Sequence, residues 1–329
     1  MNAKKTVLIL GASGGVGGAI ATALQQDGWH VRAMARHPET ARNHAPAVAD
    51  WRRGDAMNRA DVVAAASGVQ AIVHAVNPKG YRNWDTLVLP MIDNTIAAAR
   101  AAGGARVVLP GTVYNYDPEA APVIDAATPQ QPKSAKGRIR VALEQRLEAA
   151  APDVPSLILR AGDFFGPDTR QSWFSQAMVA PGKPLRRIVN PATGPGHSWA
   201  YLPDLAEAFA RLMAAEARLR PFERVQFEGV VDESGTRMTD AIQRVAGRSL
   251  PVWRFPWWLM SALAPFGGMP REVAEIAPHW RHPMRFDNRR LVELIGAEPR
   301  TDLDAAIRQT LLGLGCLENG HRAAMPATA

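Results

Sequence analysis

Residues 6–18 place a buried strand, a glycine turn and the start of a helix in direct succession, and this succession restricts the fold more than any other feature of the sequence. The unbroken apolar run at 7–10 is typical of a strand covered on both faces of a parallel sheet. Gly11 allows a tight turn, Gly14 lets a pyrophosphate approach the backbone, and Gly17 lets the next helix pack closely. The helix N-terminus then offers free N–H groups to phosphates. We therefore predict a dinucleotide site, in preference to a plain strand-to-helix turn or a flexible N-terminal segment.

The spacing Gly-x-x-Gly-x-x-Gly, within the segment VLILGASGGVGG, resembles the extended short-chain dehydrogenase/reductase superfamily, which includes nucleotide-sugar epimerases. In that superfamily this turn binds NAD or NADP. The resemblance implies that Ser13, Gly15 and Val16 contact the cofactor together with the three spaced glycines.

Further apolar segments alternate with helical patterns along the chain. Strands are expected at 30–36, 50–55, 69–76, 106–112, 156–162 and 224–229. This alternation predicts an α/β fold, a Rossmann-type doubly wound parallel sheet with a smaller C-terminal substrate lobe. We assign residues 1–165 to the NAD(P)-binding Rossmann domain, with 198–230 returning to it. Residues 166–197 and 231–318 form the expected substrate lobe, and 319–329 form a tail.

Composition narrows the class of protein. The chain has 329 residues, of which 47% are hydrophobic, so it can bury a large core. The single cysteine, Cys316, excludes an internal disulfide and a cysteine metal cluster, and no His-x-x-x-His pair is expected on a helix, so we expect no metal. No stretch approaches the roughly 18 apolar residues of a membrane span. With no leader sequence recognised, a cytoplasmic location is expected.

The net charge of +7 comes from scattered arginines, without a long basic run or a nucleic-acid motif. A phosphorylated cofactor or an anionic small-molecule substrate explains this charge better than a nucleic-acid partner does. The sequence is also compatible with a homodimer.

The end of the second predicted strand bears on the choice of cofactor. An acidic residue there binds the ribose 2′-OH of NAD, whereas an arginine accommodates the 2′-phosphate of NADP. Here the strand ends in Arg36, with no acid between Trp29 and Pro38. We predict NADP, with NAD as the alternative if Arg36 is only a solvated loop residue and Glu39 does the work of the acid.

The resemblance implies further cofactor contacts where other strands end. They are Asp55 and Ala56 at the adenine, Ala75, Val76 and Asn77 beside the nicotinamide ribose, Pro110 near the end of the fifth strand, and Lys136 at the start of the helix that follows. Asp55 is also a candidate cap for the helix that starts near Asn58.

In the superfamily, the fifth strand ends in a serine or threonine that polarises the substrate, and Thr112 stands at that place. The superfamily then uses Tyr-x-x-x-Lys at the start of the next helix, which puts both side chains on one face. This chain departs from the pattern, because Lys136 holds the tyrosine position and Arg140 the lysine position. The usual tyrosine acid is therefore absent.

Two replacements for that acid are open. Lys-x-x-x-Arg resembles the isoflavone-reductase-like and NmrA-like atypical members, which implies Lys136 as the proton-handling group. Burial beside Arg140 would favour the neutral amine. Alternatively, Tyr114 or Tyr116 supplies the phenol. The plainer interpretation is that Lys136 and Arg140 are exposed helix residues without chemistry.

Candidate substrate contacts are Tyr81 in a polar and aromatic loop, Asp163 and Phe165 after the sixth strand, His197, and Arg290, which resembles a phosphate-binding arginine of the epimerases. Residues 251–268 carry three tryptophans and two phenylalanines among prolines. We expect this segment to form core of the smaller lobe, with a membrane-surface anchor or a dimer face as the alternatives.

These features favour an NAD(P)-dependent reductase or dehydrogenase of a small carbonyl or alcohol. A nucleotide-sugar epimerase or dehydratase is the second hypothesis, and it needs a different proton carrier. The third is a cofactor-binding regulator or assembly factor without turnover, which the NmrA-like resemblance suggests. The fold alone does not separate the three.

Overall fold

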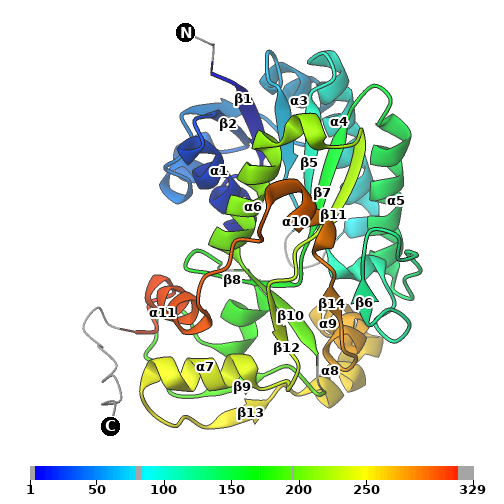
Figure 1. Ribbon diagram of the computed structural model, residues 1–329. Coiled ribbons are helices and arrows are strands. Elements are labelled where there is room, and N and C mark those ends of the chain that lie inside the picture. Colours follow the sequence, from blue (N-terminus) through cyan, green and yellow to red (C-terminus); the bar gives the residue numbers. More distant parts are fainter. Residues whose placement is uncertain (1–3, 79–82, 170, 195, 318–329) are drawn as a thin grey trace.

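The computed structural model describes residues 4–78, 83–169, 171–194 and 196–317, and it has a large helix-covered sheet and a smaller lobe (Figure 1). The strands of the large sheet are β1 (Thr6–Leu10), β2 (His30–Ala35), β3 (Asp50–Arg53), β4 (Ala71–His74), β5 (Arg106–Gly111), β7 (Ser156–Arg160) and β11 (Phe222–Gln226). Their order is β11-β7-β5-β4-β1-β2-β3, and all neighbours are parallel. The predicted Rossmann-type sheet is confirmed.

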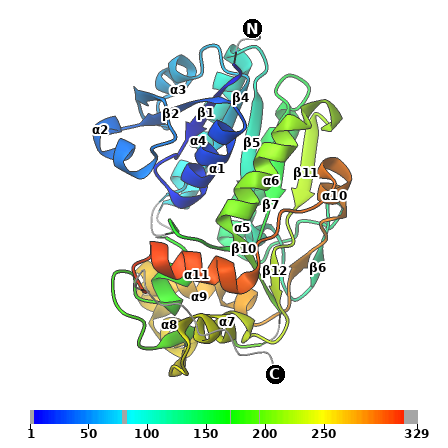
Figure 2. The same cartoon turned by 60° about the vertical axis from the view of Figure 1, so that its left-hand side comes forward.

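Helices cover both faces of this sheet. They are α1 (Gly15–Gln26), α2 (Pro38–Ala41), α3 (Arg59–Ala65), α4 (Trp84–Ala101), α5 (Ala135–Ala150), α6 (Leu202–Ala214) and α10 (Arg289–Ile295). Along β1, Val7 and Ile9 pack with α1 and α6, whereas Leu8 and Leu10 pack with α3, α4 and α5. Figure 2 shows α1 and α6 side by side on the first face. Burial on both faces explains the unbroken apolar run of this strand.

The strand order reverses at β1, since β2 lies on one side of it and β4 on the other. In open α/β sheets, ligands bind in the crevice outside the carboxyl ends of the strands at such a reversal. The glycine turn leaves the carboxyl end of β1, so it lies at this crevice.

The smaller lobe has its own apolar core, in which Phe174, Trp199, Ile242 and Leu311 are buried. The strands outside the large sheet are β6 (Val123–Ile124), β8 (Asp163–Phe165), β9 (Ile188–Asn190), β10 (His197–Tyr201), β12 (Val230–Asp232), β13 (Val252–Arg254) and β14 (Arg285–Phe286). Of these, β6, β8 and most of β10 lie in the ranges assigned to the Rossmann domain, but they pair with strands outside its sheet. The helices of the smaller lobe are α7 (Arg237–Ala246), α8 (Trp257–Leu263), α9 (Gly268–Ile276) and α11 (Leu303–Gly313). Helix α10 lies within the range assigned to this lobe but packs Leu291 and Leu294 against the main sheet.

The aromatic segment at 251–268 is only partly core. Trp257 is buried, but Trp253, Trp258 and Phe266 are exposed. The expectation that this segment forms core is therefore wrong for three of its five large aromatic side chains. The seven-residue helix α8 has only one side against the lobe, so the remaining apolar side chains project outward.

Candidate active site

The turn after β1 has room only for glycine at two positions. A Cβ on Gly11, whose φ is +92°, would lie 2.5 Å from the carbonyl oxygen of Ala75. A Cβ on Gly17 would lie 2.3 Å from the carbonyl oxygen of Gly11. The missing side chains therefore let β1, α1 and the end of β4 meet closely, as the glycine spacing predicts.

The N-terminus of α1 suits a pyrophosphate. In the described part of the chain, no side chain caps this end, and the first turn contains no acid. The N–H groups of Gly15, Val16 and Gly17 thus lack the side-chain acceptor that many helices have. Ser13 and Gly14 precede them and are exposed. This end of α1 fits a dinucleotide, because a pyrophosphate can accept from these N–H groups.

The end of the crevice where we expect the adenine is basic. Arg36 follows β2 and is exposed, and Ala35 beside it is in register with Arg53 of β3. Glu39, the alternative NAD-type acid, pairs instead with Arg53 at 3.2 Å. Arg36 has no ion pair with any carboxylate of the described ranges. The geometry thus leaves Arg36 available to an anionic group.

Asp55 shapes the turn before α3 but does not cap that helix. Its carboxylate accepts from the Met57 N–H at 3.0 Å, and the Asn58 side chain accepts from the Ala60 N–H. The capping expectation is therefore wrong, because Asn58 is the residue directly before the helix.

Asn94 of α4 is buried and donates to the carbonyl oxygen of Ala56 at 2.9 Å. The bond holds the exit of β3, with its two predicted adenine contacts, against α4.

The end of the crevice where we expect the nicotinamide is connected to α5 by a hydrogen bond. Asn77 follows β4 and Ala75–Val76, and its side-chain oxygen accepts from Arg140 at 2.9 Å. The Arg140 guanidinium lies 4.7 Å from the ring centre of Trp84. The arginine of the Lys-x-x-x-Arg pattern thus reaches Asn77, the predicted ribose contact in the segment after β4.

The turn after β5 packs on the start of α5. Thr112 follows Pro110 and Gly111, and its hydroxyl oxygen accepts from the Tyr114 N–H at 3.3 Å. A Cβ on Gly137 would lie 2.2 Å from the Tyr114 carbonyl oxygen, so a glycine is needed for this approach. The turn that carries Thr112 and Tyr114 therefore lies beside the start of α5, where Lys136 directly precedes Gly137.

Lys136 is buried and forms ion pairs with Glu272 and Glu275 of α9. One Glu275 oxygen also accepts from the N–H groups of Ala135 at 2.6 Å and Lys136 at 3.2 Å. Burial would raise the pKa of Glu275, but the hydrogen bond and charge of Lys136 outweigh it and hold the pKa below its ordinary value. Glu275 therefore fixes both the ammonium group and the helix start.

The burial of Lys136 and Arg140 contradicts the interpretation that they are exposed helix residues. Sequence reasoning also missed Glu272 and Glu275. The prediction that the Lys136 amine is neutral was made without these two carboxylates. Nothing in the α9 segment marks them as partners of a residue more than 130 positions away.

Among the candidate substrate contacts, Asp163 and His197 lie together, with a carboxylate oxygen 2.7 Å from Nε2 of the imidazole. The His197 ring stacks on Trp280 with 3.8 Å between ring centres. His279 makes an edge contact with Tyr114, and burial lowers the pKa of His279 to about 4. This cluster therefore borders the Tyr114 turn.

The other candidates lie elsewhere. Phe165 is fully buried and packs with Phe174 and Tyr201, so it supports the lobe. Arg290 is held by Glu223 at 2.8 Å and also pairs with Glu293. Tyr81 lies outside the described residues.

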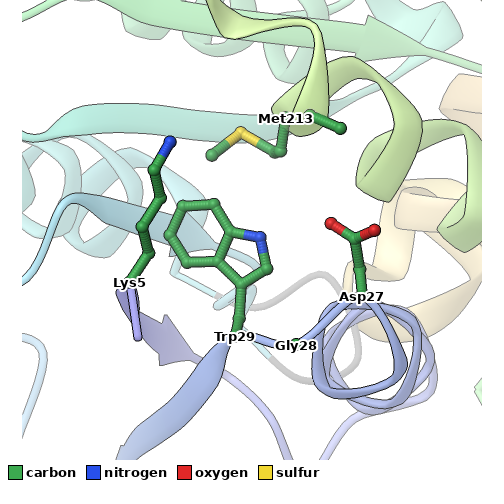
Figure 3. A pocket seen from close by; sticks show the side chains of 6 residues that line it. Lys5, Asp27, Gly28, Trp29 and Met213 are labelled. Carbon is green, nitrogen blue, oxygen red and sulfur yellow. The ribbon is translucent and has the colours of Figure 1, made fainter. Parts of the chain in front are cut away.

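A hollow lined by Lys5, Asp27, Gly28, Trp29 and Met213 is shown in Figure 3. It lies where β1 and β2 begin, opposite the carboxyl edge that holds the glycine turn. We therefore do not assign the cofactor to it. Within the described ranges, no group of three or more metal-binding side chains occurs, and no helix is long and apolar enough to cross a membrane.

Comparison with known proteins agrees with this geometry. The family model described as "NAD dependent epimerase/dehydratase family" matches residues 7–226. A 3-diazoavenalumate denitrifying reductase of Streptomyces sp is 27% identical over 178 residues, which are 50% of this chain and 57% of that protein. The chain thus aligns with little more than half the length of this curated relative.

Two solved structures share the fold over 98% of their own length. UDP-glucose 4-epimerase from Bifidobacterium longum, in complex with NAD+ and UDP, has a TM-score of 0.72 at 13% identity over 95% of this chain. UDP-glucuronic acid 4-epimerase from Bacillus cereus, in complex with NAD, has a TM-score of 0.72 at 15% identity over 94% of this chain.

Proposed function

Because the chain belongs to the NAD-dependent epimerase/dehydratase family, we propose that it is an NADP(H)-dependent reductase or dehydrogenase of a small carbonyl or alcohol. The observation that carries this proposal is the buried Lys136, held by two carboxylates at the place where the superfamily has its tyrosine. Its ammonium group is a proton donor on the helix that also contacts the predicted ribose site through Arg140.

In the proposed reduction, Lys136 gives a proton to the carbonyl oxygen as the carbonyl carbon gains a hydride, so an alcohol forms. When bound, NADPH supplies that hydride. Glu275 orients the ammonium group by accepting from it and from the helix backbone. Glu272 is partly exposed, so it links Lys136 to solvent and lets the lysine regain its proton. Thr112 polarises the carbonyl from the adjoining turn.

Two observations favour reduction over sugar-nucleotide epimerisation. Lys136 and Arg140 form a Lys-x-x-x-Arg pattern that resembles the isoflavone-reductase-like members, and Arg290, the candidate phosphate ligand, is already held by two glutamates. One relative of the chain is named as a reductase, which also supports the proposal.

The proposal is tested by incubating the protein with NADPH and a panel of aliphatic and aromatic aldehydes and ketones, and following loss of NADPH absorbance. We expect stoichiometric alcohol formation. Parallel samples receive UDP-glucose or UDP-glucuronic acid with NAD. Epimer formation without net cofactor consumption would establish the epimerase hypothesis instead, and tight cofactor binding without any turnover would establish the regulator hypothesis.

The choice of cofactor is a separate prediction. In fluorescence titrations, the wild type is expected to bind NADPH more tightly than NADH. Arg36→Ala removes a charge-assisted contact to the 2′-phosphate, so NADPH affinity should fall by about 10- to 100-fold while NADH affinity is unchanged. Arg100→Ala, a change at an exposed arginine near the end of α4, is the control. Equal NADPH and NADH affinities in the wild type would contradict the role of Arg36.

A further inference from the structure

The outer side of the smaller lobe carries large exposed apolar side chains on consecutive elements. Trp258 of α8 is 73% exposed, Phe266 is 87% exposed, and Met269 of α9 is 58% exposed. Trp253 of β13 is also exposed. The views in Figures 1 and 2 place α8 beside α9 at the end of the molecule away from the N-terminus. We call residues 252–271 the aromatic face.

The charged side chains at the two ends of the aromatic face are arginines. Residues 255–270 contain no charged side chain, and exposed Arg254 and Arg271 flank them. The longer stretch 241–271 has four arginines and no carboxylate. The apolar centre is therefore bordered by cations alone along the chain.

The neighbouring strand extends this pattern. β13 pairs with β9, and the guanidinium of Arg187, just before β9, lies 4.4 Å from the ring centre of Trp253. Arg186 is exposed beside it, and residues 169–203 contain no aspartate or glutamate. In the described part of the chain, no carboxylate pairs with Arg186, Arg187, Arg254 or Arg271.

We propose that the aromatic face docks this protein on an anionic lipid surface. Tryptophan and phenylalanine side chains insert at the boundary between headgroups and acyl chains, and the bordering arginines meet the acidic headgroups. A second copy of the chain fits this face less well, because a symmetric contact would bring unpaired arginines of both copies together. The lipid surface supplies the negative charge that the face itself lacks.

Docking would bring the candidate active site close to the lipid, since α9 also provides Glu272 and Glu275 to Lys136. The proposed docking does not depend on the reaction proposed above. The exposed side chains of α8 and α9 that would contact the lipid are different from the two glutamates of α9 that hold Lys136.

The test is co-sedimentation of the full-length protein with equimolar phosphatidylcholine–phosphatidylglycerol vesicles and with pure phosphatidylcholine vesicles. We expect binding to the mixed vesicles that weakens with added salt. The Trp258→Ser/Phe266→Ser double variant should bind at least about tenfold more weakly, because two aromatic side chains that would enter the lipid are lost. Arg254→Gln/Arg271→Gln should weaken binding to the mixed vesicles by about 20-fold.

Met57→Ser changes an exposed apolar residue before α3 and is the control for the first variant, with unchanged binding expected. Arg100→Gln is the control for the second. Melting temperatures confirm that all variants are folded. No binding to mixed vesicles, or equal binding to both vesicle types, would overturn the proposal. So would a dimer that Trp258→Ser/Phe266→Ser converts to a monomer while vesicle binding is unchanged, since the occupant would then be a second copy.

Discussion

Lys136→Met is expected to lower kcat/KM for carbonyl reduction by about 10²- to 10⁴-fold, because general acid catalysis is lost. NADPH affinity should fall far less than kcat/KM, since the glycine turn and Arg36 are untouched and Lys136 is only one of the predicted cofactor contacts. The measurement is steady-state NADPH oxidation with the best carbonyl of the substrate panel, together with a cofactor titration.

Removal of a buried ammonium group also leaves Glu272 and Glu275 without their cation, so stability has to be separated from catalysis. Lys136→Arg does this, because arginine keeps the charge and the ion pairs but does not give up a proton near neutral pH. We expect Lys136→Arg to melt close to the wild type and to be as inactive as Lys136→Met.

Lys133→Met is the matched control, because Lys133 is an exposed lysine three residues earlier that pairs with Asp117 and Glu119. Its kcat/KM should stay within about twofold of the wild type, since a surface ion pair contributes little. Full activity of Lys136→Arg would contradict the acid role and would favour Tyr114 as the proton donor.

The fold could be predicted because its signals are local. The run at 7–10 is apolar at every position since both faces of β1 are covered, and the glycines follow it directly in the chain. The other six strands of the large sheet were predicted for the same reason, with ends that shift by one to three residues; β2, for example, ends at Ala35 where Arg36 was predicted. The short strands of the smaller lobe were not predicted.

The candidate site was harder to predict from the sequence, because the residues that pair with one another there come from distant parts of the chain. Lys136 could be singled out from its place in the helix, but Glu272 and Glu275 resemble ordinary helix surface residues. The prediction that residues 251–268 form core was wrong at Trp258 and Phe266, because composition does not reveal whether an apolar side chain is covered. Arg160 and Glu144 likewise come from different elements, and only the structure pairs them.

That pair carries the largest stability effect that we expect. Arg160 of β7 and Glu144 of α5 are both buried, and Nη2 of the arginine lies 2.8 Å from each carboxylate oxygen. Asn115 and Gln130 donate to the same carboxylate, and Arg160 also donates to the Thr112 carbonyl oxygen at 2.7 Å. The network therefore connects the core to the turn that carries Thr112.

Glu144→Ala is expected to destabilise the fold by about 3–5 kcal/mol, because it leaves the Arg160 guanidinium buried without a counter-charge. Thermal and denaturant unfolding measure the loss. Arg146 lies on the same helix as Glu144, and Arg146→Ala removes its partly exposed pair with Asp93 of α4, which should cost under about 1 kcal/mol. The Glu144→Leu/Arg160→Met variant should recover much of the stability, because it removes both charges and keeps the volume. A Glu144→Ala protein as stable as Arg146→Ala would show that Arg160 finds another partner or water, and the network would then not be what holds the Thr112 turn in place.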